Sequence, residues 1–488
     1  MLTALSTRLK DICLVQSSLY VLSASWLVIA SAISPLSAQT VNPEDSLRAG
    51  LTASKVLEAE RQAFIVARQA IATSNAKNDL TGTFALSGSH IQTDKADTPG
   101  GFTSSNSRSG SITLKKQIYD FGEADSRMES ARYGLDSARA SYQSSEQQVI
   151  LTILTAHLNV ITAQKAYDIR SNNTKRLTAQ TEAENIKLEA GTSTPTRLAE
   201  AEARLARAKS DEIQAAANLQ SAEEAYQSLT GLDNYNLRPL TRQTANLPAT
   251  IEEAEQIAGI EHPLILSGLA AEKQAGIEFK ILKTSLLPKL NFSLSAVQND
   301  QQGASMDKDE VTSKLEFSTP FLVTEGSRAA DRRAAAGVSR SRAQLAETRR
   351  TVRLTARKAF RDYEVARAQL ASVEAEINAA RLVAQGTASE VEYGLKTFLD
   401  QLDAEQSLSD TELRLVQTQE AIILNGYRLL QAIGRLSVEM FLPEDILPAL
   451  DSISDPASRY PLSSRYLLAA GLNNPIFSLL LPLSHRAG

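Results

Sequence analysis

Four segments of the chain alternate between apolar and polar side chains, which is the period of a β-strand with two unlike faces. They lie near residues 81–92, 110–119, 289–298 and 310–321. In the third segment Leu290, Phe292 and Leu294 alternate with polar residues. A transmembrane barrel uses strands of this kind, with the apolar face toward lipid and the polar face toward the lumen. The alternative is an ordinary hairpin that packs one face on helices.

Much of the remaining chain has the pattern of long helices. No proline interrupts the stretches from Glu123 to Glu189 and from Gly326 to Tyr393. At 1.5 Å per residue, a helix over either stretch is about 100 Å long. A shorter segment follows each stretch, and the second carries apolar residues at every seventh position, as at Leu408, Leu415 and Ile422. A seven-residue repeat predicts closely packed helix pairs.

The two halves of the chain repeat the same order of predicted elements. The spacing between Gly191 and Gly394 equals that between Gly231 and Gly434, and each of these glycines lies at an end of a helical pattern. We therefore predict one duplicated unit, which reads helix, two strands, very long helix and shorter helix. The predicted domains are a first repeat at 39–231, a linker in an equatorial region at 232–250, a second repeat at 251–436 and a flexible C-terminal tail at 437–488.

The N-terminus has the order of a secretory signal peptide. Arg8 and Lys10 precede an apolar stretch from Leu14 to Ile33, and small residues follow up to Ala38. This pattern predicts a signal peptide at residues 1–38, cleaved after Ala38, and the alternative is an uncleaved membrane anchor. No later stretch of about 18 residues is apolar without interruption, so we expect any membrane insertion to be by strands rather than helices.

Composition disfavours several other classes of protein. The 51 basic and 56 acidic residues give a formal net charge of -5, whereas nucleic-acid binders usually carry a basic excess. The single cysteine, Cys13, lies in the predicted signal peptide, and the four histidines have no ligand-like spacing. His157 lies in an apolar run and is expected to pack between helices. We therefore predict no enzymatic activity, no catalytic residue, no cofactor and no metal site, although carboxylates could still bind cations.

Four amphipathic strands cannot close a barrel by themselves, because small transmembrane barrels need about eight. An open sheet in lipid would leave unpaired backbone groups at its edges, each costing several kcal/mol. Identical chains related by cyclic symmetry can share one barrel. A dimer would supply eight strands and a trimer twelve, and the long helices would continue the ring as a helical tube.

Several short motifs recur in an order that resembles a known family. They are 117–122 (QIYDFG) at a strand-to-helix turn, 287–290 (LPKL) before the third strand, 394–404 (GLKTFLDQLDA) and 432–436 (AIGRL). Together they resemble the TolC family of outer-membrane efflux and type I secretion channels. The resemblance implies a mainly α fold with membrane β-strands, in which the duplicated unit forms one third of a trimeric 12-stranded β-barrel continued by a 12-helix periplasmic α-barrel.

The same resemblance implies a function and partners. The chain would be the exit duct of a tripartite export system in the outer membrane of a Gram-negative bacterium, with a large periplasmic portion. Its partners would be two further copies of itself, a periplasmic adaptor (membrane fusion) protein, an inner-membrane ABC or proton-driven transporter and outer-membrane lipid, with no nucleic acid. Type I protein secretion and multidrug efflux both remain open. The alternative function is a periplasmic coiled-coil adaptor or scaffold without a pore, which the two predicted hairpins disfavour.

Two acids match positions where the family places rings of carboxylates around the pore. Asp400 and Asp403 are three residues apart and therefore share one helix face. In a trimer six carboxylates would surround a narrow constriction, which would exclude anions and attract cations. The alternative is a pair of solvated carboxylates favoured by the dipole at a helix N-terminus.

Other predicted site residues concern the closed tip of the helical tube. The resemblance places Lys396 and Thr196 at interhelical latches, but the expected acidic latch position is occupied by Arg197. A contact between Lys396 and Arg197 would be repulsive, so Glu200 or Glu392 are alternative partners. Gly191 and Gly394 are predicted to begin the tip turns, where glycine permits a left-handed cap.

Overall fold

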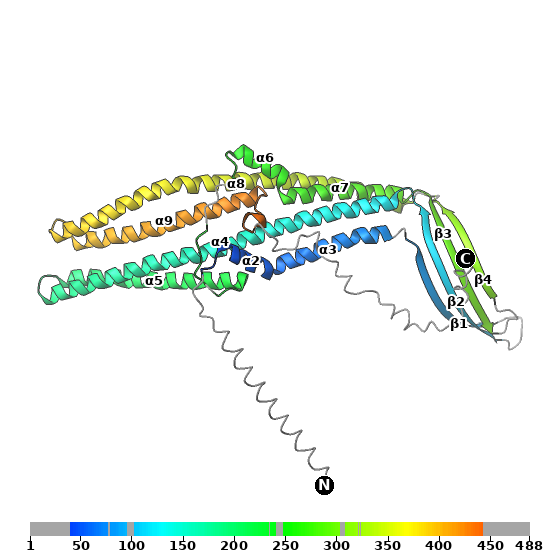
Figure 1. Ribbon diagram of the computed structural model, residues 1–488, viewed down its shortest axis with the longest axis horizontal. Coiled ribbons are helices and arrows are strands. Elements are labelled where there is room, and N and C mark those ends of the chain that lie inside the picture. Colours follow the sequence, from blue (N-terminus) through cyan, green and yellow to red (C-terminus); the bar gives the residue numbers. More distant parts are fainter. Residues whose placement is uncertain are drawn as a thin grey trace, which may run out of the picture. The chain divides into compact units, whose positions relative to one another are not determined.

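The computed structural model describes residues 40–76, 79–94, 102–233, 235–240, 247–302, 308–320, 322 and 324–442. The predicted signal peptide at 1–38 lies outside the described residues, as does the predicted tail from residue 443 onward. Helices make up most of the described chain, together with one small sheet (Figure 1).

The elements follow the same order twice along the chain. The first series is α2 (Pro43–Ala53), α3 (Lys55–Ala76), β1 (Thr81–Asp94), β2 (Phe102–Tyr119), α4 (Glu123–Glu189) and α5 (Pro195–Thr230). The second is α6 (Ile251–Glu261), α7 (Pro263–Thr284), β3 (Lys289–Gln302), β4 (Lys308–Ser318), α8 (Glu325–Glu392) and α9 (Phe398–Ala432), followed by the short 3-10 helix η1 (Val438–Met440).

Each series opens with two helices, whereas the hydrophobic pattern predicts one. In the second series the break falls at His262, whose side chain accepts a hydrogen bond from the backbone N–H of Leu264 (3.2 Å). Pro263 follows at the first turn of α7, where its missing N–H removes no intrahelical bond. An apolar period of 3.6 residues continues across such a break, so the pattern alone does not reveal it.

The sheet is antiparallel throughout, in the order β1-β2-β3-β4. The central pairing of β2 with β3 joins the two series, and the register shifts between Gln117 and Tyr119, which leaves Ile118 in a β-bulge. The strands differ in length from the alternating segments: β2 begins at Phe102 rather than near residue 110, and β4 ends at Ser318 rather than 321. Pro320 lacks the N–H that a longer ladder would need.

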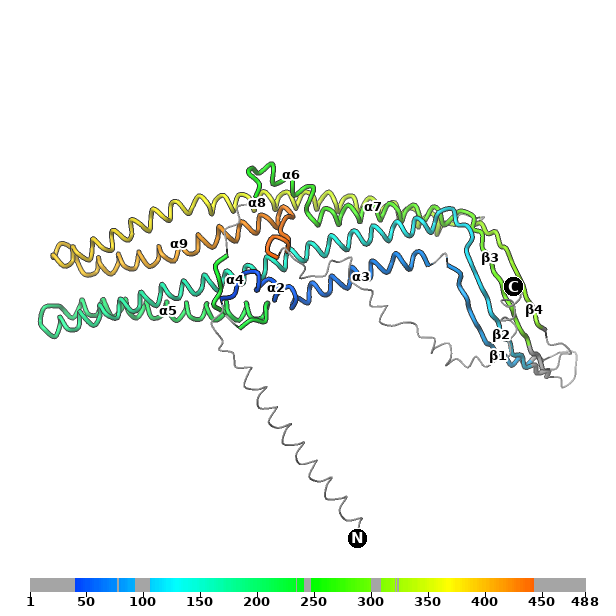
Figure 2. The backbone as a smooth tube through the Cα atoms, viewed as in Figure 1, coloured from blue at the N-terminus to red at the C-terminus, as the bar shows by residue number. Residues whose placement is uncertain are grey.

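The chain divides into two compact units. The hairpin unit contains the described residues of Met1–Ala49, Ile153–Thr241 and Ala384–Val416. The sheet unit contains the described residues of Gly50–Thr152, Arg242–Val383 and Gln417–Gly488. The hairpin unit thus includes two helical hairpins, one formed by the end of α4 with α5 and the other by the end of α8 with the start of α9 (Figure 2).

The core of the hairpin unit is built from small and medium side chains. One cluster contains Leu177, Ala201, Ala208, Phe398 and Leu402, so residues of both hairpins contribute to it. Ala201 and Ala208 are seven residues apart on α5, and both are buried. Alanine at such positions lets helix backbones approach closely, because its side chain occupies little space between them.

Among the described helices, α4 is the one long and apolar enough by length and composition to cross a membrane. Its apolar stretch includes Ile150, Leu154 and Leu158, all of which are buried within the protein. The core helix of a water-soluble bundle has the same composition, so the stretch is accounted for by helix packing.

Candidate functional site

One face of the sheet is apolar and exposed. The paired residues of neighbouring strands share a face, so the register defines rows across the sheet. Four successive rows are Tyr119–Leu290–Phe317, Lys116–Phe292–Leu315, Gly82–Leu114–Leu294–Ser313 and Phe84–Ile112–Ala296–Val311. Val311, Leu315 and Phe317 are 74%, 65% and 66% exposed. Since burying one such side chain is worth about 1.5–3 kcal/mol, this face is matched to an apolar environment.

The opposite face of the sheet is polar. Ser87 and Ser109 share a hydrogen bond of 2.6 Å between their hydroxyls. Lys314 forms an ion pair with Glu316, with 2.6 Å between Nζ and Oε2, and Glu316 also attracts Lys115 electrostatically. Hydroxyls and charges of both signs on one face, opposite an apolar face, give the two-sided character that a strand between lipid and a water-filled lumen requires.

The turn between β2 and α4 is held by the side chain of Asp120. Its carboxylate accepts hydrogen bonds from the backbone N–H groups of Gly122 (3.0 Å) and Ala124 (2.8 Å), which caps the helix. Phe121 and Gly122 both have positive φ, 54° and 81°. The motif at 117–122 that carries the family resemblance is therefore a strained strand-to-helix corner, in which Asp120 supplies the cap.

Glu123, the first residue of α4, connects this corner to β3. Its carboxylate pairs with Lys289 at 2.7 Å and with Arg127. Burial by itself would raise the pKa of Glu123, but hydrogen bonds from Lys289 and Arg127 hold the pKa below its usual value. The buried carboxylate is therefore charged and ties the start of α4 to the start of β3.

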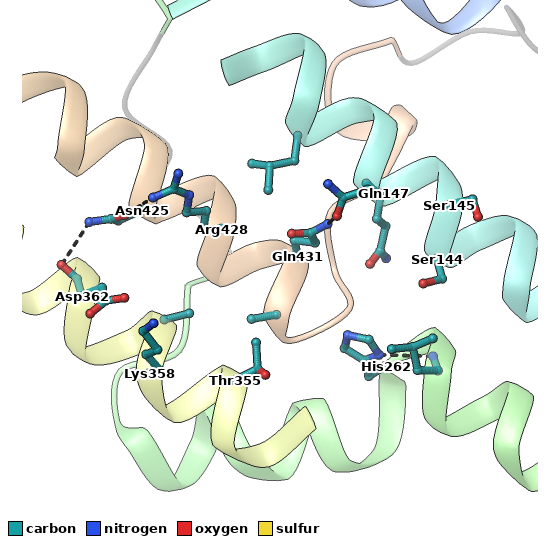
Figure 3. A pocket seen from close by; sticks show the side chains of 15 residues that line it. Ser144, Ser145, Gln147, His262, Thr355, Lys358, Asp362, Asn425, Arg428 and Gln431 are labelled. Carbon is teal, nitrogen blue, oxygen red and sulfur yellow. Dashed lines mark hydrogen bonds between the residues drawn. The ribbon is translucent and has the colours of Figure 1, made fainter. Parts of the chain in front are cut away.

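A cavity of about 680 Å³ in the sheet unit lies between α4, α8, α9 and the turn at His262 (Figure 3). Asn425 Nδ2 donates to the backbone carbonyl of Asp362 (3.2 Å), which links α9 to α8. Gln431 Nε2 donates to the side chain of Gln148 (2.9 Å), which links α9 to α4. The polar groups of the lining thus bond helix to helix, and they hold the end of the second series against α4.

The predicted tip turns lie at the ends of the two helical hairpins. Gly191 and Gly394 have φ of 73° and 76°, the left-handed conformation that the sequence predicts for them. In both turns a backbone N–H beyond the glycine reaches back to the last turn of the helix, from Thr192 to the Lys187 carbonyl (2.8 Å) and from Leu395 to the Glu390 carbonyl (2.7 Å). The two turns are therefore built alike.

Asp400 lies in the first turn of α9 and takes part in a capping box. Its carboxylate accepts from the backbone N–H of Thr397 (2.9 Å), and the hydroxyl of Thr397 accepts from the N–H of Asp400 (3.2 Å). The hydrogen bonds from the side chain and backbone of Thr397 lower the pKa of Asp400. Asp403, one turn on, forms an ion pair with Arg204 of α5. Both acids thus have local partners within one chain.

Two of the three residues proposed for latches, Lys396 and Arg197, have contacts within the chain. Lys396 pairs with Glu390 at 2.9 Å, so its acid is Glu390 and neither Glu200 nor Glu392. The guanidinium of Arg197 lies over the ring of Phe398, 5.7 Å from its centroid, in a cation–π contact. Thr196 is exposed. Glu390 and Lys396 flank the turn six residues apart, outside the i to i+4 spacing that a helix pattern would suggest.

Two further contacts join the hairpins, and their residues were not singled out from the sequence. Arg170 of α4 pairs with Asp410 of α9 at 2.9 Å, and Gln180 of α4 donates to Glu405 (2.6 Å). Together with Arg204 and Asp403 they form three polar cross-links between the first and second hairpin. Partners more than 190 residues apart give no local pattern, so no sequence signal could have paired them.

A buried hydrogen-bond network holds the N-terminal segment of the hairpin unit. His157 Nε2 lies 2.9 Å from the backbone carbonyl of Arg238, so this nitrogen carries the proton. His157 Nδ1 then accepts from Ser46 (2.9 Å), and Ser46 accepts from the Tyr226 hydroxyl (2.7 Å). All three side chains are essentially inaccessible to solvent. His157 is therefore a structural residue packed between helices, as predicted.

Comparisons with known proteins agree with this architecture. The model of the outer membrane efflux protein family matches residues 59–232 and 256–435. The outer membrane efflux protein BepC of Brucella suis biovar 1 is 26% identical over 377 residues, covering 76% of this chain and 80% of that protein. The alkaline protease secretion protein AprF of Pseudomonas aeruginosa is 23% identical over 314 residues, covering 61% and 63%.

A solved structure shares the fold. The crystal structure of the Campylobacter jejuni CmeC outer membrane channel matches with a TM-score of 0.71 at 16% identity, covering 83% of this chain and 87% of that one. Long paired helices in a duplicated order, joined to a sheet with an exposed apolar face, define the class of outer-membrane channel proteins.

The chain belongs to the outer membrane efflux protein family. The predicted resemblance and the outer-membrane location with a periplasmic portion are confirmed. The function as an exit duct for efflux or type I secretion is confirmed as well, and the adaptor alternative is not favoured. Members of this family are channel proteins rather than enzymes.

Proposed function

We propose that three copies of this chain form one outer-membrane channel, with a twelve-stranded barrel continued by a periplasmic tube of twelve helices. The observation that carries the proposal is the exposed apolar face of the four-stranded sheet. This face requires an apolar solvent, and the strand order leaves β1 and β4 as edges. Pairing β4 of one chain with β1 of the next satisfies both edges, as a bilayer demands.

The strand order favours closure by identical chains. Neighbouring strands in the order β1-β2-β3-β4 are antiparallel, so β4 and the β1 of a following chain also run antiparallel. Each added chain therefore continues one regular sheet. Eight strands enclose a lumen that side chains fill, whereas about twelve leave it open. A duct needs an open lumen, which favours the trimer over the dimer.

The duplicated series supports two equivalent repeats in each chain. The repeats at 39–231 and 251–436 would each contribute two strands, one long helix and its shorter partners. The linker at 232–250 would lie in an equatorial region. Its described part contains a short parallel bridge between Val41 and Leu237, which supports a fixed course for the linker across the hairpin unit.

The channel would work in a tripartite system, with a periplasmic adaptor and an inner-membrane ABC or proton-driven transporter. An outer-membrane duct has no energy source of its own, so the transporter must supply it. BepC is named an efflux protein and AprF a protease secretion protein. Relatives of both kinds support a duct that serves either cargo class, selected by the transporter that it joins.

The tip of the hairpin unit would form the gate. Asp400 and Asp403 would line the threefold constriction, with Lys396, Thr196 and Arg197 beside it and the turns at Gly191 and Gly394 at its rim. In place of the latch expected at Arg197, the ion pairs Arg204–Asp403 and Arg170–Asp410 would hold the two hairpins together. Opening would then require both pairs to separate.

The experiment is to express the full chain, separate inner and outer membranes, and measure the mass of the protein extracted in mild detergent. We expect it in the outer membrane with the mass of a trimer, because the apolar face and both sheet edges are then covered. Recovery as a soluble periplasmic monomer would contradict the proposal. A dimer in the outer membrane would agree with a shared barrel but would contradict the twelve-stranded lumen.

A further inference from the structure

Lys116 is placed where a barrel strand should be apolar. It lies on β2 in the row with Phe292 and Leu315, on the exposed apolar face. Among the described residues of the four apolar rows, Lys116 alone carries a charge. The other residues are aromatic or aliphatic, apart from one glycine and one serine. A lysine facing lipid is costly unless its ammonium group reaches a polar partner.

The protein itself supplies no such partner among the described residues. Lys116 is exposed and forms no ion pair or hydrogen bond with another described side chain. Its neighbour Lys115 points to the opposite face, where it is attracted by Glu316. The two adjacent lysines therefore differ: Lys115 has an acid within its own chain, and Lys116 has an unmatched positive charge on the apolar face.

Aromatic residues surround Lys116 at the helix-bearing end of the sheet. The bulge at Ile118 brings Tyr119 opposite Leu290, and hence onto the same face as Lys116. Tyr119 packs edge-to-face on Phe121, with 4.7 Å between ring centroids, and Phe317 completes that row. Aromatic rings mark the level of lipid headgroups in membrane proteins. A lysine one row deeper can extend its chain and bring the ammonium to that level.

We propose that Lys116, with Tyr119 beside it, binds the phosphate of an anionic phospholipid in the periplasmic leaflet of the outer membrane. The proposal rests on the barrel of the proposed function, which sets this end of the sheet at the periplasmic surface. The lipid chains lie along the apolar rows, and the headgroup phosphate meets the ammonium group. An ammonium-free headgroup such as phosphatidylglycerol suits the site, because it adds no competing positive charge.

The test compares two adjacent lysines in the assembled protein. Wild type, Lys116→Gln and Lys115→Gln are reconstituted in nanodiscs of phosphatidylcholine with a minor fraction of phosphatidylglycerol, and lipid retained by the trimer is counted by native mass spectrometry. We expect about fivefold weaker retention of phosphatidylglycerol in Lys116→Gln, the effect of one lysine at an anionic surface. Lys115→Gln should match wild type, and Lys116→Arg should retain the lipid.

The outcomes separate this inference from the barrel itself. A wild-type protein that does not enter the nanodisc as an oligomer would remove the proposed function. Entry without preference for phosphatidylglycerol, or equal loss in the Lys115 and Lys116 variants, would overturn the lipid site alone. Displacement of the lipid by excess glycerol phosphate would assign the site to a soluble phosphate and also overturn the lipid assignment.

Discussion

The sheet and the hairpin unit arrange the same kinds of residue in opposite ways. On the sheet, Val311, Leu315 and Phe317 are large apolar side chains that are exposed. In the hairpin unit, Leu177, Phe398 and Leu402 are buried and the charged residues Asp403 and Lys396 are exposed. In the proposed channel each arrangement lowers the free energy in its own solvent, lipid for the sheet and water for the hairpins. One chain is therefore adapted to two solvents.

The two regions also differ in what fixes their register. The sheet is held by continuous backbone pairing between its four strands. The described residues of the two hairpins are joined by side chains, through the apolar cluster and through polar contacts such as Arg170 with Asp410 and Gln180 with Glu405. Backbone pairing is insensitive to side-chain identity, whereas a side-chain cross-link is lost by one substitution. We therefore expect that substitutions that change the function lie mainly in the hairpins.

The largest effect is expected when a charge is placed on the exposed apolar face of the sheet. Leu294 lies in a middle row of the apolar face, and its neighbour Ser295 lies on the polar face. Leu294→Lys places a charge near the bilayer midplane, at a cost of about 2–4 kcal/mol in each chain, so the trimer yield should fall sharply. Ser295→Lys should be tolerated, because its neighbours across the sheet are Thr113 and Thr312. Trimer recovered from outer membranes is the readout.

The contrary result is informative as well. Equal yields of the two variants would mean that both faces meet water, and the assignment of the sheet to a membrane would be wrong. A smaller defect for Phe317→Lys than for Leu294→Lys is expected, since the row of Phe317 lies nearer the headgroups and the cost there falls to about 0–1 kcal/mol.

Features of the fold that depend on local patterns can be predicted from the sequence, and features that depend on distant residues cannot. The strands and heptads are recognisable because their periods are local. The start of β2 cannot be recognised from the sequence, because Ser104, Ser105 and Asn106 have the composition of a loop. They belong to the strand because their backbone pairs with β1. The tip glycines are recognisable because a left-handed turn requires them. The acid that pairs with Lys396 cannot be recognised in this way, because Glu390 contacts Lys396 across the turn, at a spacing that no helix pattern contains.

One partly buried acid of the sheet unit, Glu146 on α4, has no ion-pair partner among the described residues. Burial, together with the charge of Glu439, raises the pKa of Glu146 on α4 to about 7. The pKa of Glu146 in the folded protein thus exceeds the usual value of 4.5. Between pH 4.5 and about pH 7 the folded protein therefore binds a proton that the unfolded chain has released. The contribution of Glu146 to stability is therefore fully present below about pH 4.5 and is lost as the pH rises through about 7, where the carboxylate must be charged.

Glu146→Gln removes this titration. At about pH 8 the variant should be more stable than wild type by about 3 kcal/mol per chain, from a pKa shift worth 1.36 kcal/mol for each unit. At about pH 4.5 the two should be equal. Denaturant midpoints across this pH range provide the measurement, and Glu58→Gln, an exposed acid on α3, is the control. A stability gain independent of pH would mean that Glu146 does not titrate there.

A smaller effect is expected from the buried network of the hairpin unit. Tyr226→Phe removes the hydroxyl that donates to Ser46 and leaves a buried oxygen without its donor. We expect the free energy of unfolding to fall by about 1–3 kcal/mol, the usual cost of an unsatisfied buried polar group. Tyr235→Phe is the matched control, because the Tyr235 ring contacts Tyr226 but is only half-buried. Similar losses in both variants would mean that the loss does not come from the buried hydrogen bond between Tyr226 and Ser46.

The smallest change in stability, with a distinct functional readout, concerns the carboxylates of the tip. Asp400→Ala removes half of a capping box, and Asp403→Ala removes the ion pair with Arg204. Each should lower the free energy of unfolding by about 1 kcal/mol or less, since exposed pairs and caps contribute little. If both acids line the constriction, six carboxylates in the trimer set the selectivity of the pore.

The double variant Asp400→Ala and Asp403→Ala should therefore assemble normally, lose cation selectivity and lose block by divalent cations in planar bilayers. Asp410→Ala is the matched control, because it also removes an ion pair between the hairpins, that of Arg170, but leaves the proposed ring intact. It should loosen the closed tip and raise the conductance while keeping the selectivity for cations. If selectivity is unchanged in the double variant, Asp400 and Asp403 serve only as a helix cap and a cross-link. The comparison thus separates the charge that faces the pore from the charge that holds the hairpins together.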